Sequence, residues 1–388
     1  MEAFAAAVNS EALVYLVDPN LSASARAEFE ALIAGSSRPD RARDSAQSLG
    51  DSQGWLRIAT GGSGGRLKFA CHDEATLRAA AGGFLEHFGF GRVQAIGVLP
   101  MHHVSGLMPW IRCAVSGGDF TPCSWKALES GFRPEVGPGE WVVSLVPTQL
   151  QRLVSDADSV DWLRRFRTVF VGGAPLWPAL AERAAELGLR LSTGYGMSET
   201  AAMVTGLLPE EFLGGERGCG AALPHARIEI GADGRISVSG ESLFRGYAGG
   251  ARHSGSFETA DLGSVDSRGH LTVLGRSDGM IVTGGEKVDP FLVESALQAA
   301  GIFTDVVVVG LDHGEWGQEL VACHPDPDAR PDPARLKKAL EALAPHERPK
   351  RYIAVHPWPR TSQGKIDRLR LAKEAAAGQE SAFTQGKK

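Results

Sequence analysis

Short apolar runs alternate with amphipathic stretches through the middle of the chain. The strand candidates are residues 95–99, 141–146, 168–171 and 190–193. Each run ends at Gly, Pro or Thr, residues that commonly punctuate buried strands. Helical spacing of apolar residues marks 74–88, before the first of these strands, and 176–187, between the last two, and Asp73 is placed to cap the first of these helices. This alternation predicts an α/β layer with a largely parallel sheet.

After about residue 215 the pattern changes to shorter strands. Residues 226–230 and 235–239 flank an Ala-Asp-Gly turn, which is a hairpin signal. Residues 270–274 and 280–283 flank a second turn. These alternating strands predict a small antiparallel β unit.

A third composition begins near residue 285. It contains a helix candidate at 290–300, a strand candidate at 305–309, a Pro- and Asp-rich stretch at 325–333 and a helix that ends near Leu343. We expect the chain to fray from about Glu374 onward. The order predicts a small α+β unit at the C-terminal end.

The chain of 388 residues is too long for one compact core. We expect a large N-terminal domain over residues 1–275 and a small mobile domain over residues 276–388. The hinge is expected at 276–278. No internal repeat is visible.

Composition narrows the function classes. Hydrophobic residues make up 43% and charged residues 22%, values typical of a folded soluble protein, and a net charge of −6 disfavours nucleic acid as the main partner. The five cysteines are scattered, which argues against a zinc site and a disulfide framework. No signal peptide and no apolar run of about 20 residues is seen. These features predict a cytoplasmic protein without a membrane span.

A glycine-rich loop at residues 60–68 gives the first chemical signal. Gly62 and Gly65 allow backbone N–H groups to crowd around an anion. Thr60 and Ser63 add hydroxyl groups, and Lys68 adds positive charge. The pattern favours phosphate binding, with a flexible turn as the alternative, and its spacing differs from that of a Walker loop.

Four further segments carry polar residues in a fixed order. They are residues 172–175, residues 194–200, residues 259–263 together with 275–278, and residues 359–366. Each alone has a structural interpretation: a strand-to-helix turn, a core tyrosine at Tyr195, a turn cap at Asp261, or a solvated lysine at Lys365.

Taken together and in this order, the five segments resemble the adenylate-forming superfamily of acyl-CoA synthetases, luciferases and peptide-synthetase adenylation domains. The resemblance covers about residues 55–372. It implies an α/β fold in which a large N-terminal domain and a small mobile C-terminal domain enclose an active site. It also implies ATP, Mg²⁺ and a carboxylic acid as ligands, with coenzyme A as the co-substrate.

The resemblance assigns the nucleotide contacts residue by residue. The loop 60–68 corresponds to the segment over the β- and γ-phosphates. The adenine pocket would be walled by Gly173, Ala174 and Pro175, with Tyr195 stacked on the base. Asp261 would accept both ribose hydroxyls, and Arg276 would make a second ribose contact.

The catalytic assignments follow in the same way. Glu199 corresponds to the acidic residue that holds Mg²⁺, and Ser198 would offer its hydroxyl to the α-phosphate. Lys365 corresponds to the lysine that reaches the reacting groups during adenylation. Asp278 occupies the hinge position, and a rotated C-terminal domain would present residues 284–287 when the thiol attacks.

The chain departs from the family pattern at several positions. Gly61, Gly64 and Leu67 stand where the family loop usually has Ser, Thr and Pro, and Ala260 replaces a glycine of the ribose motif. Both changes are expected to be tolerated, with weaker ATP binding. The loop also begins at Thr60, much earlier than in most relatives, which predicts a shortened N-terminal subdomain.

The acyl substrate is indicated by residues 100–107, which resemble the family's acyl-pocket segment and contain His103. With residues 240–247, they are most similar to the o-succinylbenzoate–CoA ligases of menaquinone and phylloquinone synthesis. Ser192 and Thr193 are candidate contacts to the acid. Other aryl or short-chain acyl-CoA synthetases, carrier-protein-loading enzymes and a non-catalytic nucleotide-binding relative stay open. A homo-oligomer is compatible with the sequence.

Overall fold

The computed structural model divides the chain into two compact units. The first comprises Met1–Leu176 and Glu182–Leu274, and the second Trp177–Ala181 and Gly275–Lys388. The structure describes residues 13–19, 21, 23–36, 54–61, 67–327, 332–360 and 366–385. Each unit is described below by itself.

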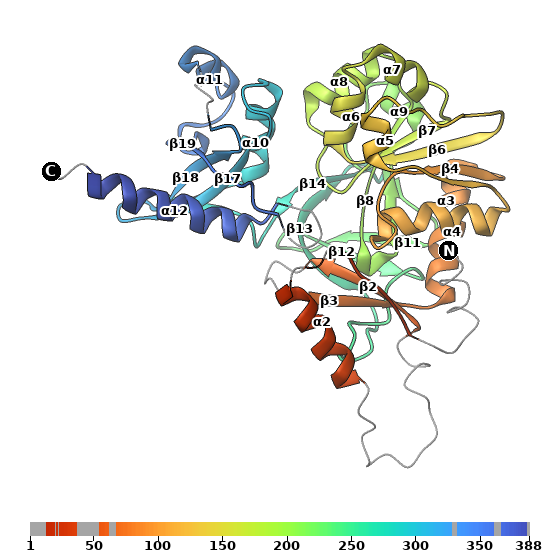
Figure 1. Ribbon diagram of the computed structural model, residues 1–388. Helices are drawn as coiled ribbons and strands as arrows, with labels where there is room; N and C mark the ends of the chain where they lie inside the picture. The colour runs from red at the N-terminus through yellow and green to blue at the C-terminus, as the bar shows by residue number, and fades with distance from the viewer. Residues whose placement is uncertain are drawn as a thin grey trace. The chain divides into compact units, whose positions relative to one another are not determined.

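A seven-stranded sheet with the order β10-β9-β8-β7-β6-β4-β5 organises the first unit (Figure 1). Its strands are β4 Val93–Gly97, β5 Phe120–Pro122, β6 Glu140–Leu145, β7 Thr168–Val171, β8 Leu191–Met197, β9 Ala202–Gly206 and β10 Ala221–Ala222. The strands from β5 to β8 pair in parallel, and β9 and β10 add to the edge in antiparallel fashion. The predicted parallel sheet is therefore confirmed.

Helices cover both faces of this sheet. They are α3 Glu74–Phe88, α4 Val104–Ser116, α5 Trp125–Glu129, α6 Pro147–Leu153, α7 Ala157–Leu163, α8 Pro178–Glu186 and α9 Pro209–Leu213. Figure 1 shows α3 and α4, in orange, on one side of the strands and α6 and α7 on the other. Apolar side chains of both helices pack with β4, β6 and β7 in one buried cluster and with β2 in another, so the helices are fixed on the sheet.

Helix α3 begins and ends where its sequence requires. Asp73 is the N-cap, and its carboxylate accepts a hydrogen bond from the Thr76 backbone N–H at 2.9 Å while the Thr76 hydroxyl accepts from the Asp73 N–H at 3.2 Å. This reciprocal pair satisfies two N–H groups that a helix start leaves open. Gly89 ends the helix in the left-handed conformation, with φ of 62°. The predicted cap is confirmed.

Two smaller sheets complete the first unit. One contains β1 Val14–Leu16, β2 Leu56–Gly61 and β3 Leu67–His72. Helix α2, Ala23–Ser36, lies between β1 and β2 in the sequence. The other contains β11 Ala226–Ile230, β12 Arg235–Gly240, β13 Phe257–Val265 and β14 Leu271–Arg276. The predicted β11–β12 hairpin is confirmed.

The second predicted turn joins strands of different sheets. β14 belongs to the four-stranded sheet above, whereas β15, Ile281–Thr283, pairs with β16 and β18 in the second unit. The expectation that residues 270–274 and 280–283 belong to one antiparallel unit is therefore wrong. The turn between them marks the passage from one unit to the other.

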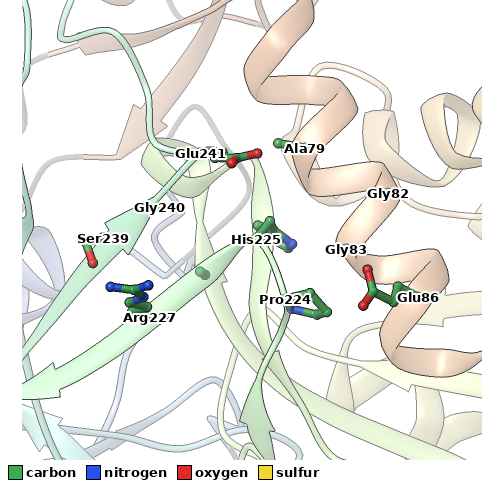
Figure 2. A pocket seen from close by; sticks show the side chains of 11 residues that line it. Ala79, Gly82, Gly83, Glu86, Pro224, His225, Arg227, Ser239, Gly240 and Glu241 are labelled. Atoms are coloured by element: carbon green, nitrogen blue, oxygen red, sulfur yellow. The ribbon is translucent and has the colours of Figure 1, made fainter.

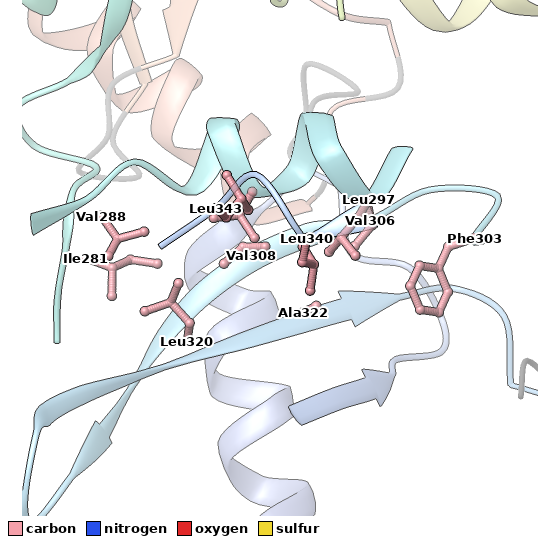
Figure 3. Packing of buried hydrophobic residues seen from close by; sticks show 11 residues of the cluster. Ile281, Val288, Leu297, Phe303, Val306, Val308, Leu320, Ala322, Leu340 and Leu343 are labelled. Carbon is pink, nitrogen blue, oxygen red and sulfur yellow. The ribbon is translucent and has the colours of Figure 1, made fainter. Parts of the chain in front are cut away.

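The second unit is a five-stranded sheet covered by helices, as the α+β prediction required. Its remaining elements are β16 Glu286–Val288, α10 Pro290–Ala299, β17 Val307–His313, β18 Gly317–His324, α11 Pro333–Ala339, β19 Arg351–Ala354 and α12 Arg368–Gln385. Figure 3 shows its core, where Leu297 packs near Val306 and Val308 beside the strands. Burial of each such side chain stabilises the fold by roughly 1.5–3 kcal/mol. Because α12 continues to Gln385, the expected fraying from Glu374 is wrong.

The helices of the described residues include none with the length and apolar character that crossing a bilayer requires.

Candidate active site

The hairpin of β2 and β3 carries the predicted phosphate loop. Thr60 on β2 stands opposite Lys68 on β3 in the antiparallel register, which places a hydroxyl and an ammonium group at one end of the hairpin. Thr60 is half-buried and Lys68 is exposed. Gly62, Ser63 and Gly65 lie outside the described residues, so their phosphate contacts stay predictions.

Glu199 lies in a single 3₁₀ turn, Ser198–Thr200, between β8 and β9. Its side chain is only 6% exposed. The Thr60 hydroxyl donates a hydrogen bond to Glu199 Oε1 at 3.1 Å, and the Tyr247 hydroxyl donates to the same oxygen at 2.7 Å. A buried carboxylate requires such donors because it has lost its water. The structure thus brings together two predicted residues that lie 139 positions apart.

Tyr247 is a part of this cluster that sequence reasoning missed. Burial, together with the negative charge of Glu199, raises the pKa of Tyr247 above its usual range. The hydroxyl therefore keeps its proton and can donate to the carboxylate. Residues 240–247 were noticed only for their family resemblance, and no local pattern linked Tyr247 to Glu199.

The turn that follows Glu199 has strained backbone. Ala201 and Ala202 have φ of 51° and 78°, a region that costs a residue with a side chain about 1 kcal/mol or more. The Thr200 hydroxyl holds the turn, since it accepts from Met197 N–H at 2.9 Å and donates to Ala202 O at 2.6 Å. The surrounding structure therefore fixes the position of Glu199.

His72 is a second residue that sequence reasoning missed. It is fully buried and its Nε2 donates to the backbone oxygen of Ser198 at 2.7 Å, while Nδ1 lies 3.1 Å from the Thr76 hydroxyl. Burial lowers the pKa of His72 to about 4, so the ring is neutral at pH 7. It connects helix α3 to the Glu199 turn. A lone histidine in a sequence carries no signal of such a role.

Tyr195 and Asp261, predicted for adenine and ribose, also lie together. The Tyr195 hydroxyl donates to Asp261 Oδ2 at 2.6 Å. The Asp261 N–H in turn donates to the Thr259 hydroxyl at 3.1 Å. Tyr195 is 9% exposed and packs in an apolar cluster with Val204 and Leu271, so its ring also has a structural role.

The predicted adenine wall follows β7. Gly173, Ala174 and Pro175 form an exposed loop between β7 and α8. Gly173 has φ of 81°, which a glycine adopts without strain. In parallel sheets, loops at the carboxyl ends of strands are the usual ligand-binding positions.

The residues present suit Mg²⁺. This ion is commonly bound through one or two carboxylates together with substrate phosphates. Glu199 supplies one carboxylate, and both hydrogen bonds that it accepts within the described residues are made at Oε1. No group of three or more His, Cys, Asp or Glu side chains in the described part of the chain could hold a metal without such phosphates.

The candidate acyl contacts differ in their surroundings. His103 precedes α4 as its N-cap without a capping side-chain bond, and its ring lies 4.3 Å from that of His102. The Thr193 hydroxyl donates to Gly218 O at 2.6 Å. Ser192 is fully buried, and its Oγ has no hydrogen-bond partner among the described residues. Whether Ser192 contacts the acid stays a prediction, because its hydroxyl is enclosed by the sheet.

The predicted residues of the second unit form a separate group. Arg276 pairs with Asp278 through Nε–Oδ1 and Nη2–Oδ2 distances of 2.8 and 2.7 Å. Gly284 and Gly285 have φ of 58° and 87° in the tight turn between β15 and β16. Lys365 lies outside the described residues, and its role stays a prediction.

A pocket of about 490 Å³ lies elsewhere on the first unit. Figure 2 shows His225 and Glu86 on opposite sides of it, between α3 and the start of β11. Its lining contains none of the residues predicted for nucleotide or acid, so it is separate from the candidate site.

Comparison with known proteins identifies the family. The profile of the AMP-binding enzyme family matches residues 17–248, more than half of the chain. A probable 2-succinylbenzoate–CoA ligase of Mycobacterium tuberculosis is 31% identical over 83% of this chain and 84% of its own length. The 2-succinylbenzoate–CoA ligase of Listeria monocytogenes is 31% identical over 70% of this chain and 60% of its own length.

A solved structure agrees with the fold. The o-succinylbenzoate CoA synthetase of Bacillus subtilis, in complex with its acyl-adenylate intermediate, superposes with a TM-score of 0.71 at 24% identity, covering 81% of this chain and 68% of that one. The α/β prediction is confirmed by this likeness. The family profile and the Mycobacterium tuberculosis relative together show that the chain belongs to the AMP-binding enzymes, the adenylate-forming superfamily indicated by its five ordered motifs.

Proposed function

We propose that the chain is an ATP-dependent acyl-CoA ligase that activates 2-succinylbenzoate as an acyl-adenylate and then transfers the acyl group to coenzyme A. The observation that carries this proposal is the hydrogen-bonded cluster at Glu199. Thr60 and Glu199 come from two distant motifs and meet at one carboxylate oxygen. Tyr195 and Asp261, from two other motifs, are likewise joined by a hydrogen bond.

The first half-reaction makes a mixed anhydride. A carboxylate oxygen of the acid attacks the α-phosphorus of ATP, and pyrophosphate leaves with the electron pair of the broken P–O bond. Lys68 and Lys365 would stabilise negative charge on the phosphate oxygens, the dominant contribution in reactions of this kind. Ser198 would donate its hydroxyl to the α-phosphate. Mg²⁺ held by Glu199 would supply further positive charge there.

The second half-reaction replaces AMP by a thiol. The coenzyme A sulfur attacks the acyl carbon, and AMP leaves as the thioester forms. We propose that residues 276–388 act as a mobile domain that turns about Asp278 between the two steps. Lys365 would then withdraw, and residues 284–287 would face the adenylate. Arg276 would contact the ribose while Asp261 holds its hydroxyls.

The acid is proposed from the relatives' names and from the acyl segment. The curated relatives are 2-succinylbenzoate–CoA ligases, and Ser192 is a candidate contact whose hydroxyl has no hydrogen-bond partner among the described residues. His103 and Thr193 are the other candidate contacts. A pocket for this aromatic diacid needs apolar walls with a few polar groups.

The cellular setting belongs to the same proposal. The five cysteines are free thiols, four of them buried, which suits a reducing cytoplasm.

The sequence is also compatible with a homo-oligomer. Size-exclusion chromatography with light scattering would measure the oligomeric state.

The deciding experiment measures pyrophosphate release with a panel of acids. We expect 2-succinylbenzoate to exceed benzoate, malonate and octanoate by at least about 100-fold in kcat/KM, because paired polar contacts reject analogues that lack them. Mass spectrometry should then detect the CoA ester. A preference for a fatty or simple aryl acid would overturn the substrate while keeping the reaction.

Two controls separate the alternatives. Adenylation without thioester formation on free coenzyme A would favour a carrier-protein thiol as the acceptor. The variant Glu199→Gln keeps the shape of the side chain and removes its charge, so pyrophosphate release should fall by about 100-fold or more. Equal rates of pyrophosphate release in the parent protein and in Glu199→Gln would contradict the proposed role of Glu199.

A further inference from the structure

Residues 244–248 run beside β3 and form a single antiparallel bridge with it, between Tyr247 and Ala70. Arg245 N–H donates to Cys71 O at 2.7 Å, Cys71 N–H donates to Gly246 O at 3.0 Å, and Ala248 N–H donates to Phe69 O at 2.9 Å. These bonds join the segment to the strand that also carries Lys68.

Two further contacts fix the segment at the level of Tyr247. The guanidinium of Arg245 pairs with Asp73, with Nε–Oδ2 and Nη2–Oδ1 distances of 2.6 and 3.1 Å. The Phe244 N–H donates to the backbone oxygen of Glu199 at 2.8 Å. Tyr247 is therefore held between β3 and the Glu199 turn by the backbone hydrogen bonds of the residues around it.

From that position Tyr247 contacts two charged groups of opposite sign. Its hydroxyl donates to Glu199 Oε1 at 2.7 Å. The Lys68 ammonium lies 5.3 Å from the centre of its ring, within the range of a cation–π interaction. Within the described residues Lys68 forms no ion pair with Glu199.

We propose that Tyr247 is a positioning residue that holds the Glu199 carboxylate through Oε1 and keeps Lys68 on its ring, so that neither charge neutralises the other before Mg²⁺ and ATP bind. Without the ring, an exposed lysine on a flexible stem can fold onto the nearby carboxylate. Such a pair would occupy the carboxylate that the metal needs and the ammonium that the phosphates need. This inference rests on the proposed function, because it assigns Tyr247 to the ATP site.

The test measures binding in the full chain without turnover. The probes are Mn²⁺, followed by electron paramagnetic resonance, and the analogue α,β-methylene-ATP, followed by calorimetry at several Mg²⁺ concentrations. In Tyr247→Phe the ring remains and the hydroxyl is lost. We expect metal affinity in the presence of the analogue to fall about tenfold, the value of a hydrogen bond to a charged group. Nucleotide affinity at saturating Mg²⁺ should stay within about twofold.

Tyr247→Leu removes the ring as well. Here Lys68 loses its cation–π partner, so nucleotide affinity at saturating Mg²⁺ should also fall by several-fold. Adding Lys68→Ala to Tyr247→Leu should restore part of the metal affinity, because no ammonium remains to pair with Glu199. A purely structural role for Tyr247 would not produce this recovery.

Tyr352→Phe is the matched control, since Tyr352 is a half-buried tyrosine in the core of the second unit. It should bind metal and nucleotide like the parent protein. Unchanged or tighter metal affinity in Tyr247→Phe would overturn the inference and leave the proposed function standing. Absence of binding by the parent protein itself would instead overturn the proposed function. Should Tyr247→Leu fail to fold, Tyr247→Phe still decides the matter.

Discussion

At the scale of single residues, the candidate site depends on side chains that fix other side chains. Neither hydrogen bond of the His72 ring goes to the predicted phosphate loop. One of them holds the backbone of Ser198, which is next to Glu199. Since a backbone carbonyl only accepts, Nε2 must carry the proton of the neutral ring, which leaves Nδ1 unprotonated beside the Thr76 hydroxyl. The arrangement therefore needs one tautomer.

This buried ring predicts a pH dependence of stability. Burial lowers the pKa of His72 from 6.5 to about 4. The nearby Asp73 carboxylate raises this pKa and the Arg245 guanidinium lowers it, but burial has the largest effect. Between these values the unfolded chain binds a proton that the folded chain does not. The stabilisation is thus present above pH 6.5 and is lost as the pH falls toward 4, by up to roughly 3 kcal/mol.

The measurement is urea unfolding between pH 7.5 and 4.5, with His72→Gln as the test. Glutamine can donate to Ser198 O without titrating, so the variant should show a shallower loss of unfolding free energy at acid pH, whatever its stability at pH 7. His356→Gln, at an exposed position, serves as the matched control and should follow the parent profile. Parallel profiles for the parent and His72→Gln would rule out this contribution.

At the scale of elements, helix α3 is built around two adjacent glycines with opposite surroundings. A Cβ added at Gly83 would lie 2.0 Å from Nδ1 of His225 and 2.8 Å from its Cγ. A Cβ added at Gly82 would meet nothing within 4 Å. Neither position needs a left-handed backbone, so packing alone decides what each substitution costs.

We expect Gly82→Ala to raise the unfolding free energy by roughly 0.5–1 kcal/mol, because alanine is the better helix former. Gly83→Ala should lower it by roughly 1–3 kcal/mol, because the methyl group collides with the buried imidazole. Thermal and urea unfolding would measure both. In a His225→Ala background the sign for Gly83→Ala should reverse, and a loss that persists there would show that the collision is not the cause.

The elements also show which patterns a sequence can reveal. Helix α3 and the parallel strands β4, β6, β7 and β8 were predictable, since their caps and apolar runs are local signals, whereas the three-residue strand β5 was not predicted. The error at α12 arose because the polar end of the chain hid a segment rich in alanine, the strongest helix former. Strand β15 was misplaced because its partner β18 lies more than thirty residues away.

At the scale of the whole molecule, order along the chain was enough to indicate the family, whereas contacts at the site were not. Thr60, Glu199 and Asp261 could be proposed from short local motifs, and their roles stay predictions. Tyr247 could not, since its role depends on the pairing of residues 244–248 with β3, far away in sequence. Long-range pairing of this kind leaves no local periodicity to detect.

The proposed mobile second domain makes a prediction that single-domain catalysis does not. If Lys365 acts only in adenylation, Lys365→Ala should lower pyrophosphate release by about 100-fold or more, because charge on the phosphate oxygens loses its partner. Thioester formation from a supplied acyl-adenylate should change by less than about fivefold, since the lysine has withdrawn by then. The two half-reactions are measured separately, with acyl-adenylate and coenzyme A mixed in the second assay.

Lys373→Ala provides the matched control, as Lys373 is an exposed lysine on the described part of α12, beyond the motif at residues 359–366 in the sequence. It should leave both half-reactions near the parent rates. An equal loss in both half-reactions for Lys365→Ala would mean that the lysine stays at the reacting groups throughout, and the two-arrangement mechanism would then be wrong. A loss confined to thioester formation would place Lys365 at the coenzyme A step instead, because a residue can limit only the step in which its charge stabilises the transition state.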